Sequence, residues 1–153
     1  MKHDWLLLAG AAILLTRIKF KTDYDDLIQT ISRDYGNDPY LVKALIRVES
    51  NFKPRSHNKK GEDSRGLGQI NAPTAKALGV LDLNALFKPE YNILIMNKLI
   101  CDLKTRFSSV MDIISAYNAG RVRLDPNNMD TYYNSEYTLK VYSYYLAYKI
   151  LHA

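Results

Sequence analysis

The stretch "KALIRVESNF", residues 43–52, places a glutamate on the apolar face of a predicted helix. Glu49 follows apolar residues at spacings of three, four and seven, which put all of them on one side of an α-helix. These residues are Ile46, Leu45 and Val42. Burial disfavours the charged form of a carboxyl group, so a glutamate on this face should have a raised pKa. Glu49 is therefore either paired with another group or kept protonated so that it can act as an acid.

The composition is that of one globular domain. The chain has 153 residues, of which 47% are apolar and 24% charged, enough to bury a core without further domains. A net charge of +5 favours anionic partners, namely nucleic acid, a membrane surface or the bacterial cell wall. The basic residues are dispersed and form no nucleic-acid-binding motif, so we expect no nucleic-acid partner.

The sequence offers no motif for a metal or another cofactor. Cys101 is the single cysteine, so an intramolecular disulfide is excluded. The three histidines lack the spacing of a zinc site. Nothing resembles a phosphate-binding glycine loop, a nucleophile elbow or a zinc-protease helix. We therefore expect no metal and no cofactor.

The apolar run "WLLLAGAAILL", residues 5–15, sets an N-terminal hydrophobic segment, residues 1–21, apart from the domain at residues 22–153. Its small residues lie in the middle of the run, which argues against a cleaved signal peptide. The run is shorter than the roughly 20 residues that span a bilayer, although snorkelling basic residues extend its reach. The basic flank after the run would face the cytoplasm, which conflicts with an enzyme that works outside. We expect an uncleaved anchor or a helix that packs on a partner or on its own domain.

Helical periodicity dominates the rest of the chain, and no alternating stretch is long enough to predict a sheet. The first helix is expected after a cap at Thr22 or Asp23 and ends near Gly36. The second has Asp38 as its cap and Pro39 in its first position, and runs to about Ser50. Further helices are predicted at about 74–78, 89–107, 111–118 and 135–151, with loops at 53–66 and from 119 through Pro126. The predicted fold class is mostly α.

Four local features carry chemistry when they are taken together. They are Glu49-Ser50 at a predicted helix end, "SRGLGQI" at 64–70, "AYNAG" at 116–120, and Tyr137. In this order and spacing they resemble the soluble-type (SLT) lytic transglycosylases, which are relatives of goose-type lysozyme. Other residues that match the family's pattern are Phe52, Pro54, Gly66, Leu67, Gln69, Asn92 and Ile93. The resemblance covers about residues 24–150 and implies a lysozyme-like helical domain.

The chain departs from the family's pattern at three places. Gly68 stands where the family has methionine, which removes a side chain that would line the sugar groove. The loop between Glu49 and Gln69 is about two residues longer than usual, and the turn after Asn118 lacks a second glycine. These departures concern substrate specificity rather than the type of reaction.

The resemblance implies cleavage of the β-1,4 bond between N-acetylmuramic acid and N-acetylglucosamine in peptidoglycan. Glu49 would be the sole acid and base, and the product would be a 1,6-anhydromuramoyl sugar. The resemblance also implies supporting or substrate-binding roles for Ser50, Gly66, Leu67, Gln69, Tyr117, Asn118 and Tyr137. Among these, Tyr137 would place its hydroxyl group against the Glu49 carboxyl group.

Two other functions stay open at this point. One is a hydrolytic, goose-type-like lysozyme in which Glu62 or Asp63 positions a water molecule. The other is a non-catalytic peptidoglycan-binding module, which would have no chemical need for an acid on an apolar face. The expected partner is the glycan strand of peptidoglycan, with a membrane or a larger assembly engaged through residues 5–20. The expected location is the periplasmic side of the bacterial envelope or a phage virion, where the chain would open the wall for phage entry, secretion or conjugation.

Overall fold

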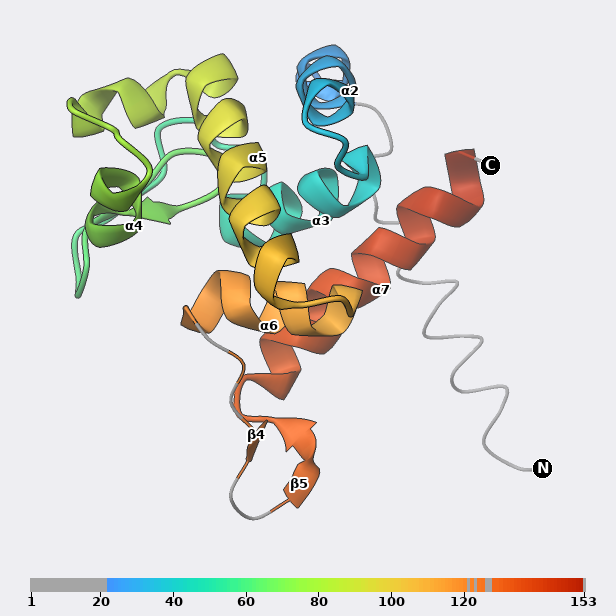
Figure 1. Ribbon diagram of the computed structural model, residues 1–153. Helices are drawn as coiled ribbons and strands as arrows, with labels where there is room; N and C mark the ends of the chain where they lie inside the picture. Colours follow the sequence, from blue (N-terminus) through green and yellow to red (C-terminus); the bar gives the residue numbers. More distant parts are fainter. Residues whose placement is uncertain (1–21, 121, 123, 126–127, 153) are drawn as a thin grey trace.

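The computed structural model describes residues 22–120, 122, 124–125 and 128–152, and most of this part is helical (Figure 1). The helices are α2 (Asp25–Asp34), α3 (Pro39–Glu49), α4 (Ala72–Ala77), α5 (Pro89–Arg106), α6 (Val110–Ala119) and α7 (Ser135–His152), with a 3-10 helix η1 (Leu83–Phe87). The predicted mostly α class is confirmed. The hydrophobic segment predicted at residues 1–21 lies outside the described residues.

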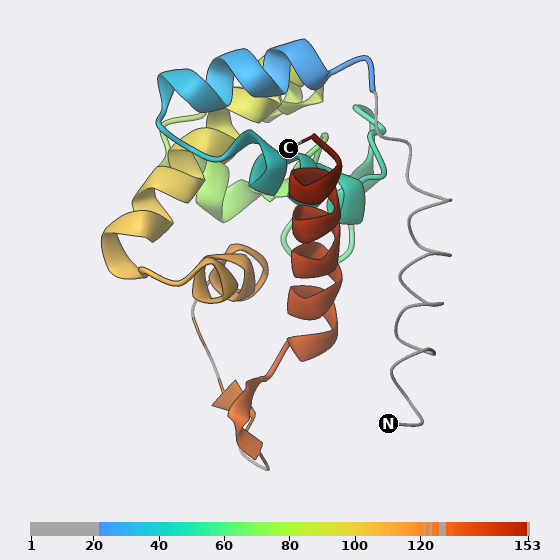
Figure 2. The same cartoon turned by 90° about the vertical axis from the view of Figure 1, so that its right-hand side faces the viewer.

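Helix α3 lies among α2, α5 and α7 and packs against all three (Figures 1 and 2). Six consecutive residues of α3, Leu41 to Ile46, are buried. Helix α5 adds a second apolar face, and α7 runs along α3 on the opposite side. The core is therefore built around the helix that ends at Glu49.

The two ends of α3 explain where Glu49 lies. At the start, the Asp38 side chain accepts a hydrogen bond of 2.9 Å from the Tyr40 backbone N–H, and Pro39 takes the first helical position, as predicted. At the end, Asn51 and Phe52 adopt positive φ values of 51° and 62°. Two successive left-handed residues turn the chain away from the helix axis. Glu49 is thus the last residue of a well-anchored helix.

Helix α2 begins later than predicted. Its N-cap is Tyr24, not Thr22 or Asp23, and Tyr24 makes no side-chain cap hydrogen bond. Thr22 instead pairs with Asp25: the Thr22 hydroxyl donates to Asp25 Oδ1 at 2.6 Å, and the Thr22 backbone N–H donates to Asp25 Oδ2 at 3.2 Å. The threonine therefore holds the first turn from outside the helix.

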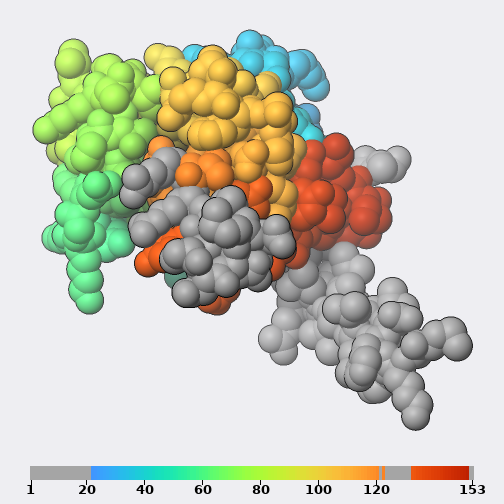
Figure 3. Space-filling view, turned by 60° about the horizontal axis from the view of Figure 1, so that its bottom comes forward, coloured from blue at the N-terminus to red at the C-terminus, as the bar shows by residue number. Residues whose placement is uncertain are grey.

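Two small antiparallel sheets lie in and just after the segments predicted as loops, so the prediction of no sheet was wrong there. Strands β1 (His57–Asn58), β2 (Ser64–Arg65) and β3 (Ile70–Asn71) form one sheet, and β4 (Leu124–Asp125) pairs with β5 (Asn128–Tyr132). Four of these strands have two residues, and such strands are too short to show an alternating pattern in the sequence. In the space-filling view the β1–β2 loop, in green, projects at one edge of the face and α7, in red, lies at the other (Figure 3).

Asn92, in the first turn of α5, holds the turn between β2 and β3. Its side chain is fully buried. Its Oδ1 accepts a hydrogen bond of 2.8 Å from the Gly68 N–H, and its Nδ2 donates to the carbonyl groups of Arg65 and Leu86 at 3.0 and 2.9 Å. One amide thus joins α5, η1 and the turn at residues 65–69.

None of the helices within the described residues is both long and apolar enough to span a lipid bilayer.

We expect Asn92→Ala to lower the free energy of unfolding by about 3 kcal/mol, because it leaves one buried N–H and two carbonyl groups without partners. Urea denaturation measures the loss. The matched control is Asn84→Ala, which removes an exposed hydrogen bond to Arg65 and should cost less than about 1 kcal/mol. An equal effect of the two substitutions would contradict this account of the turn.

Candidate active site

The structure brings Tyr137, near the start of α7, to Glu49, at the end of α3. The Tyr137 hydroxyl group donates a hydrogen bond of 2.5 Å to Glu49 Oε1. Burial raises the pKa of Glu49 from 4.5 to about 7, and the hydrogen bond, which favours the charged form, acts in the opposite direction. Glu49 is therefore present in both protonation states near neutral pH, as a general acid–base group requires.

Glu49 opens into a pocket of about 260 Å³. Its lining consists of Glu49, Asn58, Ser64, Gln69, Asn71, Tyr117 and Asn118. Among the described residues that line it, Glu49 is the only one with a carboxyl group, and the others present amides and hydroxyls. Such groups donate and accept hydrogen bonds without charge, which suits the hydroxyl and acetamido groups of a sugar.

A second pocket of about 460 Å³ continues from the first toward α4 and the end of α5. The two pockets share Asn71, Tyr117 and Asn118 in their linings. Tyr137, which donates to Glu49, also lines a third hollow together with Val48 and the first turn of α7. The two pockets that share a lining form a continuous surface next to Glu49, which fits an extended ligand.

The turn from Gly66 to Gln69 shapes one wall of the pocket. Gly66 has a φ of +79°, and a Cβ atom there would overlap the Leu86 carbonyl group and the Asn92 side chain. Gln69 also has a positive φ, 47°, which is uncommon for a residue with a side chain. Its Nε2 donates to the carbonyl groups of Ser56 and Gly66 at 3.1 and 3.0 Å. The Gln69 amide is therefore held with its nitrogen on the backbone and its oxygen left for the pocket.

Position 68 requires glycine because a side chain there would meet neighbouring atoms, not because the backbone has a positive φ. A Cβ atom at this position would lie 2.5 Å from Met96 Cγ and 2.7 Å from the Tyr117 hydroxyl oxygen. That hydroxyl group donates to the Gly68 carbonyl group at 2.9 Å. Met96, a buried core residue of α5, therefore occupies the space that a side chain at position 68 would need.

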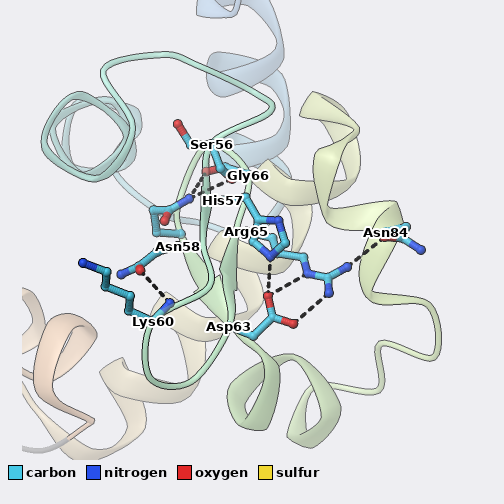
Figure 4. A network of polar contacts seen from close by, with 9 residues as sticks. Ser56, His57, Asn58, Lys60, Asp63, Arg65, Gly66 and Asn84 are labelled. Carbon is cyan, nitrogen blue, oxygen red and sulfur yellow. Dashed lines mark hydrogen bonds and ion pairs between the residues drawn. The ribbon is translucent and has the colours of Figure 1, made fainter.

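The carboxyl groups of the lengthened loop are engaged elsewhere (Figure 4). Asp63 accepts hydrogen bonds from Arg65 at 2.7 and 3.0 Å and contacts His57 Nε2 at 2.6 Å. The hydrogen bonds from Arg65, and then that from His57, hold the pKa of Asp63 well below its usual value. Glu62 accepts a hydrogen bond of 2.7 Å from Asn71 and lines the second pocket. Neither is among the described residues around Glu49 in the first pocket.

Of the other residues predicted for the site, some line the pocket and some are buried behind it. Asn118 is exposed and lines both pockets. Ser50 is only 7% exposed, and its hydroxyl group donates to the Ile46 carbonyl group at 3.3 Å. Leu67 is fully buried in the core. Ser50, Gly66 and Leu67 therefore lie behind the pocket, where they can support its walls.

The site residues predicted from the sequence did not include three residues of the pocket, Asn58, Ser64 and Asn71, although Ser64 opens the stretch "SRGLGQI". They lie in the short strands β1, β2 and β3, in or just after a segment whose polar composition predicted a loop at 53–66. A sheet of two-residue strands leaves no periodic signal in the sequence. The pairing of Ser64 with Asn58 and Asn71 across the sheet was therefore hidden until the fold was known.

The fold is similar to that of a solved lytic transglycosylase and is lysozyme-like. It matches the lytic transglycosylase Slt of Pseudomonas aeruginosa, solved as an inactive mutant, with a TM-score of 0.72 and 20% identity over 89% of this chain and 25% of that one. The model of the family "Transglycosylase SLT domain" matches residues 26–140. The chain belongs to this family, and the resemblance seen in the sequence is confirmed.

The relatives that this chain resembles in sequence come from a phage and from bacteria. A transglycosylase of Enterobacteria phage PRD1 is 32% identical over 95 residues, which is 62% of this chain and 34% of the relative. The membrane-bound lytic murein transglycosylase C of Photorhabdus laumondii is 30% identical over 113 residues, which is 63% of this chain and 31% of the relative. The chain thus spans about a third of the length of these relatives.

The raised pKa of Glu49 predicts a pH-dependent gain in stability for Glu49→Gln. In wild type the native state binds a proton more tightly than the unfolded chain, so stability falls as pH rises from about 4.5 to about 7. Glutamine does not titrate. We expect the variant's stability relative to wild type to grow by about 2–3 kcal/mol between pH 4 and pH 8.

Urea denaturation across this pH range measures the change. The exposed Glu90, in the first turn of α5, supplies the matched control Glu90→Gln, which makes the same chemical change outside the pocket and should show a smaller pH-dependent difference than Glu49→Gln. A difference between Glu49→Gln and wild type that does not change with pH would show that Glu49 is not held in a dry environment.

The contact between Gly68 and Met96 predicts coupled substitutions. Gly68→Ala alone should cost about 2 kcal/mol through overpacking, and Met96→Ala alone about 2–4 kcal/mol through a cavity. Since the new methyl group enters the space that Met96 vacates, the double variant should lose at least about 1 kcal/mol less than the sum of the single losses. Strict additivity in denaturation experiments would mean that Met96 does not fill the space beside Gly68.

Proposed function

We propose that the chain is a peptidoglycan lytic transglycosylase that cleaves the β-1,4 bond between N-acetylmuramic acid and N-acetylglucosamine. The observation that carries this proposal is the state of Glu49, a mostly buried carboxyl group with a pKa of about 7 that faces a polar pocket and is held by Tyr137. Membership of the transglycosylase SLT family and the names of the relatives support the same activity. The Slt protein of similar fold carries a glutamate-to-glutamine change in its inactive form, which agrees with an essential glutamate here.

In the proposed reaction Glu49 acts twice. The protonated carboxyl group first gives its proton to the oxygen of the scissile bond, and the bond between that oxygen and C1 of the muramoyl sugar breaks. The carboxylate then takes the proton of the sugar's own 6-hydroxyl group while the 6-oxygen forms a bond to C1. The product is a 1,6-anhydromuramoyl end, no water is consumed, and Glu49 ends protonated as it began.

The positions of the acidic residues support this route over hydrolysis. Most glycosidases use two carboxyl groups that flank the scissile bond. Asp63, the first candidate for a second carboxylate, is occupied by Arg65 and His57. Glu62 bonds to Asn71 and lines the neighbouring pocket. With Glu49 as the single carboxyl group among the described lining of its pocket, the internal hydroxyl group of the substrate is the proposed nucleophile.

The supporting residues divide into those that contact the glycan and those that hold the walls. Gln69, through its amide oxygen, and Asn118 face the pocket and would bond to sugar hydroxyl or acetamido groups. Tyr137 would orient Glu49, and Tyr117 would fix the turn at Gly68. Ser50, Gly66 and Leu67 would stabilise the backbone behind these groups.

The proposed setting is the bacterial cell envelope or a phage virion. A phage transglycosylase and a membrane-bound murein transglycosylase are among the relatives, and both places bring an enzyme to peptidoglycan. Residues 5–20 would attach the chain to a membrane or to a larger assembly. Local opening of the wall would then serve phage entry or a secretion or conjugation apparatus.

Glu49→Gln should lower the release of muropeptides from purified sacculi at least about a hundredfold, since it removes general acid–base catalysis. Glu90→Gln should keep wild-type turnover. Circular dichroism and thermal denaturation establish that both variants are folded. If turnover of Glu49→Gln stays within a few-fold of wild type, Glu49 is not the catalytic acid and base.

Mass spectrometry of the products separates the two reaction types. The transglycosylase reaction gives anhydromuramoyl ends that are lighter by one water than the reducing ends of a hydrolase. In water enriched in the heavy oxygen isotope, the anhydro product should carry no label. Labelled reducing ends as the main product would make the chain a lysozyme instead.

A further inference from the structure

Asn134 lies in the turn just before α7 and bonds to both α6 and α7. Its Oδ1 accepts a hydrogen bond of 2.7 Å from the buried Ser115 hydroxyl group and one of 3.3 Å from the Thr138 hydroxyl group. Its Nδ2 donates to the Ser115 carbonyl group and to Asn118 Oδ1, each at 3.0 Å. The Asn134 side chain therefore makes three hydrogen bonds to α6 and one to α7.

The same residue also fixes the first turn of α7. The Asn134 carbonyl group accepts the Thr138 backbone N–H at 3.0 Å and the Thr138 hydroxyl group at 3.0 Å. Thr138 is fully buried, and Tyr137 precedes it directly. Asn134 therefore binds α6 through its side chain and α7 through both its carbonyl group and its side-chain oxygen, and the side-chain bonds tie the turn that carries Tyr137 to the helix that carries Asn118.

The orientation of these amides follows from hydrogen-bond chemistry. A backbone carbonyl group only accepts, so the atom of Asn134 that faces the Ser115 carbonyl group must be the nitrogen. Its second N–H then requires an acceptor, which makes the facing atom of Asn118 the oxygen. Asn118 is consequently held with its own NH₂ group away from Asn134, available to the pocket that it lines.

We propose that Asn134 is a positioning residue, which orients Asn118 as an N–H donor toward the substrate and holds the turn from which Tyr137 reaches Glu49. The matching group on the substrate is an acceptor, and the carbonyl oxygen of an N-acetyl group is the strongest one on an amino sugar. This proposal deepens the proposed function, and the part of its test that measures turnover rests on that function. The other part, the pKa of Glu49, can be measured whether or not the chain has that activity.

The test compares Asn134→Ala with Asn37→Ala. Asn37 is a buried amide that donates to the Asn97 carbonyl group and side chain, at the opposite end of α3 from Glu49. Both substitutions remove a structural amide, so both should lower the melting temperature. Only Asn134→Ala should change the site.

Two site readouts are expected to move in Asn134→Ala. The first is the pKa of Glu49, measured by NMR of the labelled carboxyl carbon. The titratable groups set against Glu49 are Tyr137 on α7 and Tyr117 on α6. A looser bond from Tyr137 removes an interaction that lowers this pKa, so the pKa should rise by about 0.5 unit or more. The second readout is kcat/KM on sacculi, which should fall about fivefold to tenfold, through KM as well as kcat.

Asn134→Asp is the second variant should Asn134→Ala fail to fold. It keeps the acceptor for the Ser115 hydroxyl group but loses the donor to the Ser115 carbonyl group and to Asn118 Oδ1. KM should therefore rise, and the pKa of Glu49 should rise as well, because a negative charge is added near the site. Equal behaviour of Asn134→Ala and Asn37→Ala in both site readouts would reduce Asn134 to a structural residue. An inactive wild type would overturn the proposed function, whereas a shifted Glu49 pKa in Asn134→Ala alone would still support the positioning role.

Discussion

The packing of α7 along α3 is the constraint on which the site depends. It brings a tyrosine and a glutamate that are 88 residues apart in sequence into a hydrogen bond of 2.5 Å. The same packing buries most of the Glu49 carboxyl group and raises its pKa, while the tyrosine limits the rise. Burial raises the pKa of Glu49 and the hydrogen bond from Tyr137 lowers it. Together they hold this pKa near the pH at which Glu49 can both give and take a proton.

Hydrogen bonds from side-chain amides hold the segments that form the pocket walls. Asn92 anchors the turn beneath Gly68, Gln69 ties that turn to the segment before β1, and Asn134 joins α6 to α7. One wall consists of short strands and turns, whose backbone groups find few partners in regular secondary structure. An amide supplies a donor and an acceptor at once, so one side chain can satisfy two segments. These amides therefore connect the segments around the pocket without a large sheet, and the single cysteine of the chain excludes an internal disulfide.

The sequence predicted the helices well because their signals are local. The Asp38 cap with Pro39, the apolar spacing of α3 and the left-handed Gly120 that ends "AYNAG" are all features of a few neighbouring residues. The start of α2 was misplaced because Thr22 bonds to Asp25 instead of capping the helix itself. Asn58, Ser64, Asn71 and Asn134 were not predicted, since each becomes important only through a partner on another strand or helix. The filling of the space beside Gly68 by Met96 depends likewise on the packing of α5.

The central claim is that Glu49 is held in an environment that keeps it partly protonated at neutral pH, and titration of this one carboxyl group tests it most directly. Wild-type protein labelled with ¹³C at the glutamate carboxyl carbons, with Glu49→Gln used to assign the resonance, gives the pKa by NMR. We predict a midpoint of about 7. A midpoint near the ordinary value of 4.5 would show that the group is solvated and charged, and would contradict a role for Glu49 as the acid of the reaction.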